Sequence, residues 1–176
     1  MNILSLKTIC YNTDLRAWVS PSHKDYHWAP GINLPACPVV HDEIPTDCRC
    51  GIYSSPNPKT LDEYASYLNS ILVLLNNYSW LDIWTAPSDL NGMLVCRSGG
   101  ARIIGVAWID PNNEENLGFK DTQRWPAALQ ACEFFGVSAY PWKITKQLIQ
   151  TTWIEWANVD PFDTKWIKQF NKMNLQ

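Results

Sequence analysis

The sequence has no apolar run long enough to cross a membrane. Its longest uninterrupted apolar stretch, Ile71–Leu75, has five residues, whereas a membrane-spanning helix needs about 20. The start of the chain, from Met1 to Lys7, also lacks the charged head and the long apolar core of a secretion signal. We therefore expect no membrane span and a cytoplasmic, reducing location, in which cysteines stay as thiols.

The sequence also lacks an excess of basic residues. The 14 Lys and Arg residues are outnumbered by 17 Asp and Glu residues, which gives a formal net charge of -3, and no long basic run is present. Proteins that bind nucleic acids in general neutralise the phosphates with clustered Lys and Arg side chains. The composition therefore disfavours general nucleic-acid binding.

Complete catalytic patterns are missing as well. The sequence has only three histidines, His23, His27 and His41, and no serine within a G-x-S-x-G motif. The phosphate-binding pattern G-x-x-x-x-G-K-[ST] is also absent. A nucleophile needs a base and an orienting acid beside it, so the sequence favours a protein that is not an enzyme, without excluding one.

A group of metal-binding side chains is the strongest feature that is present. Cys37, His41, Cys48 and Cys50 lie within 14 residues of a proline-rich stretch. Three thiolates and an imidazole form a tetrahedral zinc set, so we predict a structural zinc ion here. The C-x-C step is shorter than the usual zinc spacing, and Cys10 could replace His41. The alternatives are reduced, buried cysteines or a disulfide such as Cys37–Cys48.

Two enzyme classes can be weighed against a structural zinc. His41-Asp42-Glu43 matches the H-x-E motif of cytidine deaminases. Those enzymes place H-x-E and P-C-x-x-C on separate helices, whereas here both pieces are within ten residues and the second has the spacing C-x-C. The deaminase class is therefore rejected. A zinc hydrolase would use three protein ligands and a water molecule, with Glu43 or His27 as base. The number of protein ligands distinguishes the hydrolase from a structural site.

Aromatic residues are abundant, with 10 Trp, 7 Tyr and 5 Phe. Arg16 precedes Trp18 by two positions, and Arg124 is followed directly by Trp125. An arginine beside an indole can stack on a flat ligand and bond its anionic edge, and Trp28 could complete such a pocket. The alternative is that the indoles fill the core and the two arginines are surface charges.

The length and the patterning predict one α+β domain over residues 1–176, in which a small antiparallel sheet is packed by several helices. Seven of the 12 prolines fall within residues 1–58, so this segment is expected to be irregular and clasped by zinc. Residues 59–176 are expected to form the α+β body.

Apolar periodicity and turn residues predict the individual elements. Strands 3–10 and 15–20 should pair through a turn at 12–14. A helix should begin at Thr60 with a capping box and end at 76–77. The other expected elements are strands 80–85, 93–97 and 101–109 with a hairpin at 98–100, a polar loop 110–123, a helix from 125 to 136, strand 137–140, helix 144–156 and a helix beginning at 160–161.

Five sequence pieces resemble a group of small bacterial proteins of actinobacterial type. They are Arg16-Ala17-Trp18, Trp28–Gly31, Cys37, Cys48–Tyr53 (C-x-C-G-I-Y) and Phe134–Val137. The resemblance spans roughly residues 15–140 and implies that the cysteine cluster belongs to one module. The group has no known activity, so the resemblance implies none.

Together these observations predict a noncatalytic binding or regulatory module. It would use zinc for its architecture and the Arg/Trp surface for a protein or small-molecule ligand. The first alternative is a small zinc-dependent hydrolase. The second is a protein that sequesters a small molecule or nucleotide, such as a counter-defence protein of a phage or mobile element.

Overall fold

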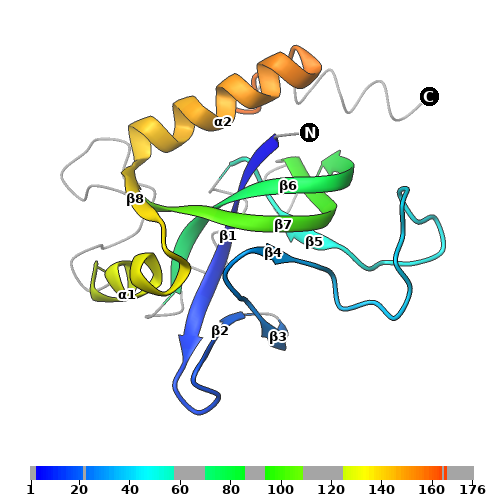
Figure 1. Cartoon of the computed structure of the whole chain (residues 1–176). Coiled ribbons are helices and arrows are strands. Elements are labelled where there is room, and N and C mark those ends of the chain that lie inside the picture. Colours follow the sequence, from blue (N-terminus) through cyan, green and yellow to red (C-terminus); the bar gives the residue numbers. More distant parts are fainter. Residues whose placement is uncertain are drawn as a thin grey trace.

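A mixed eight-stranded sheet dominates the fold of the computed structural model, which describes residues 3–21, 23–57, 70–85, 94–108, 125–163 and 165 (Figure 1). These ranges contain two helices longer than one turn. The predicted α+β arrangement, a small antiparallel sheet packed by several helices, is therefore wrong, because most of the regular structure is sheet. The assignment of residues 1–176 to a single domain stays a prediction.

Along the described residues, strands β1 to β7 come first, followed by a helix, a last strand and a second helix. The strands are β1 (Ile3–Asn12), β2 (Ala17–Ser20), β3 (His23–His27), β4 (Ile32–Asn33), β5 (Ile52–Ser54), β6 (Ser70–Thr85), β7 (Leu94–Trp108) and β8 (Ser138–Pro141). The helices are α1 (Trp125–Phe135) and α2 (Trp142–Ala157). The predicted pairing of residues 3–10 with 15–20 is confirmed as β1 and β2.

The predicted helix that begins at Thr60 is wrong over residues 70–77, which belong to strand β6. Residues 60–69 lie outside the described ranges. The run Ile71–Leu75 packs on both faces of the sheet: Leu72 and Leu74 lie in one core cluster, and Val73 and Leu75 lie in the other. A strand buried on both faces is apolar at every position, so it also satisfies the spacing of an apolar helical stripe.

The predicted hairpin at residues 98–100 is also wrong, because these residues continue strand β7 opposite β6. Gly99 is needed there for close approach: a Cβ atom added to it would lie 2.7 Å from Nε1 of Trp80 and 2.9 Å from the Ser79 side chain. Gly99 therefore marks a place where side chains of the neighbouring strand β6 lie against the backbone, not a chain reversal.

The sheet curls until its strands meet again. One edge of β7 pairs with β6, and the other pairs in turn with β4, β5 and β8. Beyond β5, Ser55 exchanges two backbone hydrogen bonds with Leu6 of β1, at 2.7 and 2.9 Å. Because β1 also pairs with β6, the strands β1, β6, β7 and β5 form a closed circuit of neighbours.

The two described helices lie on opposite faces of the curled sheet. Helix α2 lies across one face (Figure 1), where Trp153 is buried and its Nε1–H donates to the Leu4 carbonyl at 2.8 Å. Helix α1 packs through Phe135 into the cluster that contains Trp18 and Trp28. The predicted helices 125–136 and 144–156 and the strand 137–140 are confirmed within a few residues. The loop 110–123 and most of the last predicted helix lie outside the described residues.

Candidate metal centre

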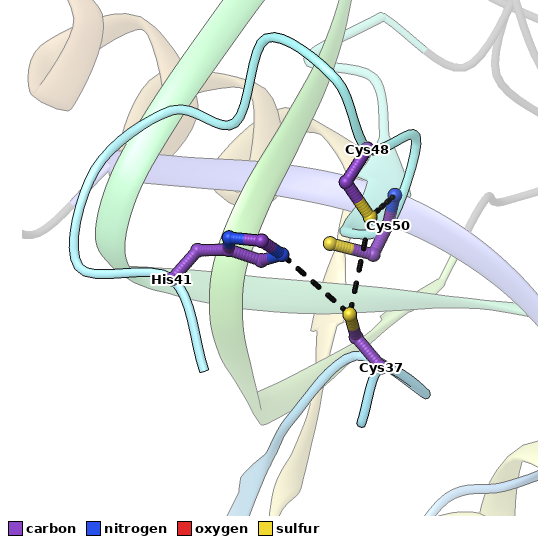
Figure 2. A group of neighbouring side chains, drawn as sticks. All are labelled: Cys37, His41, Cys48 and Cys50. Atoms are coloured by element: carbon purple, nitrogen blue, oxygen red, sulfur yellow. Dashed lines mark hydrogen bonds between the residues drawn. The ribbon is translucent and has the colours of Figure 1, made fainter. Parts of the chain in front are cut away.

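The four predicted metal ligands come together in the loop that joins β4 to β5, residues 34–51, here called the metal loop. One potential ligand atom from each of Cys37, His41, Cys48 and Cys50 lies within 4.8 Å of all the others (Figure 2). The Cys37 Sγ atom is 3.5 Å from Nε2 of His41 and 3.9 Å from Sγ of Cys48. This Cys3His cluster could hold a metal ion.

Two of the alternative arrangements of the cysteines are not found. All six cysteines are free thiols, so the structure has no Cys37–Cys48 disulfide. Cys10, the alternative fourth ligand, lies on β1 and is not in the cluster. Cys96 is fully buried, and Cys132 of α1 packs at the edge of the core, as expected for cysteines that act as small apolar side chains.

Local backbone geometry brings the two halves of the cluster together. The Cys37 N–H donates to the Pro35 carbonyl at 2.8 Å, which closes a tight turn before the first ligand. After Cys50, Gly51 has a φ of 144°, and a Cβ atom there would lie 3.1 Å from Trp80 and 3.2 Å from Arg97. Glycine therefore lets the second half of the metal loop pass directly against strands β6 and β7.

The thiols of the cluster cannot readily all ionise without a cation. The Cys50 backbone N–H donates to Sγ of Cys48 at 3.4 Å, which is the main reason that the pKa of Cys48 is lowered to about 7. Burial, together with the neighbouring thiols of Cys48 and Cys37, raises the pKa of Cys50 to about 12. A divalent cation would remove this conflict, because it favours the thiolate form of every ligand.

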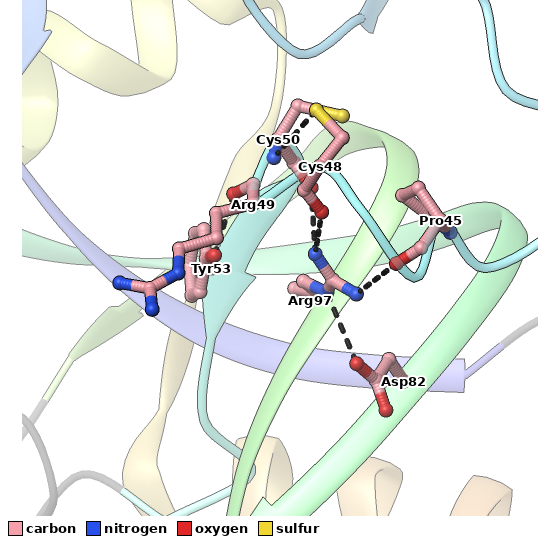
Figure 3. A network of polar contacts seen from close by, with 7 residues as sticks. All are labelled: Pro45, Cys48, Arg49, Cys50, Tyr53, Asp82 and Arg97. Carbon is pink, nitrogen blue, oxygen red and sulfur yellow. Dashed lines mark hydrogen bonds and ion pairs between the residues drawn. The ribbon is translucent and has the colours of Figure 1, made fainter.

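Arg97 of β7 holds the metal loop against the sheet (Figure 3). Its guanidinium donates to the carbonyl oxygens of Cys48 at 2.8 Å, Cys50 at 3.3 Å and Pro45 at 2.9 Å. Its Nε atom also forms an ion pair with Asp82 of β6 at 3.0 Å. One buried cation thus fixes the backbone at two of the predicted ligands.

Trp80 of β6 fixes the other half of the metal loop. Its indole Nε1–H donates to the backbone carbonyl of His41 at 3.0 Å, and the Arg97 guanidinium lies 5.4 Å from its ring centre. Sequence reasoning missed both Trp80 and Arg97 as parts of the site. Nothing in their local sequence indicates the role, since Trp80 is 39 positions from His41 and Arg97 is 49 positions from Cys48.

The chemistry of the donor set restricts the metal. Thiolate and imidazole ligands select soft or borderline cations, whereas Ca²⁺ and Mg²⁺ prefer oxygen ligands. Four protein donors also complete a tetrahedral shell. Glu43 and His27, the bases expected for a hydrolase, are exposed in the metal loop and on β3. The donor set itself is suited to holding a cation such as zinc.

The predicted Arg/Trp ligand surface stays a prediction, although two of its residues lie in the core. Trp18 and Trp28 are 1% and 2% exposed and belong to the same core cluster, as in the alternative in which the indoles fill the core. Arg16 lies in the turn before β2 with a positive φ of 51°, and Trp125 begins α1 with 37% of its surface exposed. Arg124 lies outside the described residues.

No family model, curated protein or solved structure matches the chain. Within the ranges that the structure describes, no helix is long and apolar enough to span a membrane. The metal centre is therefore the feature on which a function can be argued.

Proposed function

We propose that the protein is a noncatalytic binding or regulatory module whose metal loop is held by a structural zinc ion. The observation that carries this proposal is the convergence of three thiols and one imidazole within 4.8 Å. Zinc is the divalent metal that fits a tetrahedral Cys3His set without a redox requirement. The reduced thiols that such a site needs agree with a cytoplasmic location, which remains an expectation.

A structural role is supported by how little else orders the first half of the metal loop. Residues 34–51 contain no strand or helix, and the first half is joined to the sheet by the hydrogen bonds of Tyr26 to the Leu34 carbonyl and of Trp80 to the His41 carbonyl. Zinc binding by small structural sites is worth about 10–16 kcal/mol of apparent free energy, which is also folding energy. Zinc would therefore set the conformation of this half of the metal loop.

A noncatalytic role is supported by the completeness of the ligand set. A hydrolytic zinc keeps one position open for water, whereas four protein donors are already in reach here. Arg97 donates hydrogen bonds to the carbonyl oxygens of Cys48 and Cys50, and Trp80 donates one to that of His41. These bonds hold the backbone of the ligand residues in place. Such a site resists the ligand displacement that would be needed to admit a substrate.

The tip of the metal loop is the binding surface that we propose in place of the Arg/Trp surface. Val39 and Val40, between the first two ligands, are 59% and 83% exposed. The exposed acidic residues Asp42, Glu43 and Asp47 follow them in the same loop. An apolar tip with an acidic border is complementary to a protein surface that combines an apolar contact with Lys and Arg residues.

X-ray absorption at the zinc edge tests the structural role. We expect one zinc per chain, coordinated by three sulfurs and one nitrogen, with no oxygen ligand. A shell with only two or three protein ligands and a water molecule would instead favour the hydrolase and contradict the proposal. Metal content should be measured under reducing conditions, so that thiol oxidation does not lower it.

Peptide display tests the proposed binding surface. Peptides selected on the zinc-loaded protein should combine apolar residues with Lys or Arg. Their affinity should fall at least about tenfold in a Val39→Ser, Val40→Ser double variant that keeps its zinc, since a fall of this size corresponds to about 1.4 kcal/mol. Ile154→Ser, a change at an exposed position of α2, is the matched control. Equal binding by both variants would refute this surface.

A further inference from the structure

We propose that Cys37 and Cys48 form a peroxide-sensitive modification site, in which a two-electron oxidation joins the two sulfurs in a disulfide and releases the metal. Only the release of metal rests on the proposed function. Formation of the disulfide follows from the positions of the thiols, whether or not a metal is bound.

The distance between the two sulfurs supports this pairing. The Sγ atoms of Cys37 and Cys48 are 3.9 Å apart, in direct contact (Figure 2). A disulfide bond is about 2.05 Å long, so the sulfurs need to approach by roughly 2 Å. Both residues are partly exposed, so a small oxidant such as hydrogen peroxide can reach their thiols. The three cysteines outside the cluster, Cys10, Cys96 and Cys132, lie on β1, β7 and α1.

The backbone contacts favour the Cys37–Cys48 pair over the Cys48–Cys50 pair. Cys48 and Cys50 are separated by a single residue, and Arg97 holds the carbonyls on both sides of it. A disulfide between them would have to distort this fixed segment to reach the required Cα and Cβ geometry. Cys37, in contrast, lies on the first half of the metal loop, where its own N–H bonds only to Pro35 nearby, so Cys37 can move toward Cys48.

The chemistry is a balanced thiol oxidation by a hydroperoxide. One thiol attacks the peroxide, the O–O bond breaks, a sulfenic acid forms and the first water or alcohol leaves. The second thiol then attacks the sulfenic sulfur, the S–S bond forms, the S–O bond breaks and water leaves. The two cysteines together lose two electrons and the peroxide gains them.

As a consequence, the disulfide replaces the metal ion as the crosslink between the two halves of the metal loop. A metal that loses Cys37 and Cys48 keeps only His41 and Cys50, which is too few ligands for a stable tetrahedral site. The new disulfide still joins the two halves of the metal loop, and the bonds from Arg97 to Pro45 and from Trp80 to His41 do not involve sulfur. The sheet should therefore remain folded while the metal leaves.

Trypsin offers a direct readout of the disulfide pairing. The chain has no Lys or Arg between Lys24 and Arg49, and the next one is Lys59. Peptide 25–49 therefore contains both Cys37 and Cys48, and Cys50 falls in peptide 50–59. The proposed disulfide leaves peptide 25–49 uncrosslinked and lighter by two hydrogens, whereas any disulfide to Cys50 links the two peptides.

The experiment treats the zinc-loaded protein with hydrogen peroxide and follows released zinc with a chromogenic chelator. We expect one zinc released for each internal disulfide in peptide 25–49, and recovery on adding a dithiol and zinc. Cys37→Ser should abolish that disulfide, and Cys132→Ser, the matched control, should retain it. A crosslink to Cys50, sulfinic acid in place of a disulfide, or an absence of oxidation would overturn the inference.

The two proposals fail in different ways. If the protein binds no zinc under reducing conditions, the proposed function is wrong, but peroxide treatment of the metal-free protein still tests the disulfide. If zinc binds in a four-ligand shell and peroxide produces no internal disulfide in peptide 25–49, only the modification site is wrong.

Discussion

Replacing Cys48 with serine is expected to weaken zinc binding by about three orders of magnitude or more. The serine hydroxyl is a poor ligand because it is not ionised at neutral pH, and the remaining set would be Cys37, His41 and Cys50. Loss of an outer-shell partner alone typically costs 10- to 100-fold in metal affinity, so loss of a thiolate ligand should cost considerably more. The released first half of the metal loop should become accessible to proteases.

Competition with a chelator of known affinity measures this effect, and limited proteolysis reports the state of the metal loop. Cys132→Ser is the control, because Cys132 is a partly buried cysteine outside the cluster. The far-ultraviolet spectrum of Cys48→Ser should stay close to that of the unmodified protein, since the sheet has its own core. Unchanged zinc affinity in Cys48→Ser would exclude Cys48 as a ligand.

Replacing Arg97 with methionine is expected to lower the free energy of unfolding by about 3 kcal/mol and to weaken zinc binding by about 10- to 100-fold. Methionine fills much of the same volume but donates no hydrogen bond. The carbonyls of Pro45, Cys48 and Cys50 would lose their partner, and Asp82 would lose its ion pair. Because Asp82 is 35% exposed, water would replace part of that pairing.

Urea unfolding of the zinc-loaded and metal-free forms separates the two effects. Arg102→Met is the matched control, because Arg102 is an exposed arginine on the same strand and should change stability by less than about 0.5 kcal/mol. If Arg97→Met lowered stability without changing zinc affinity, Arg97 would support the sheet but would not position the metal ligands.

The metal cluster could be predicted from the sequence because its spacing is local. All four ligands lie within 14 residues, and a segment that short can bring its side chains together whatever the rest of the fold does. The β1–β2 hairpin and the helices α1 and α2 were predictable for the same reason, since turn residues and nearby apolar side chains specify them.

The long strand β6 and the uninterrupted course of β7 could not be predicted in this way. The run Ile71–Leu75 is apolar at every position, and periodicity alone does not separate a buried strand from a buried helix. Gly99 in β7 has the residue type of a turn but serves the approach of Trp80. The burial of Trp18 could not be predicted for a similar reason, because its closeness to Arg16 in the sequence does not tell which of the two side chains is buried.

The sequence by itself determined which side chains could bind a metal, since the ligand types and their spacing are properties of one short segment. Only the tertiary structure decided how that segment is held. Arg97 and Trp80 reach the metal loop from strands that are 39–52 positions away in the chain. The closure of the sheet likewise depends on a contact between Leu6 and Ser55. Such contacts depend on how the strands pair, and no local pattern encodes that pairing.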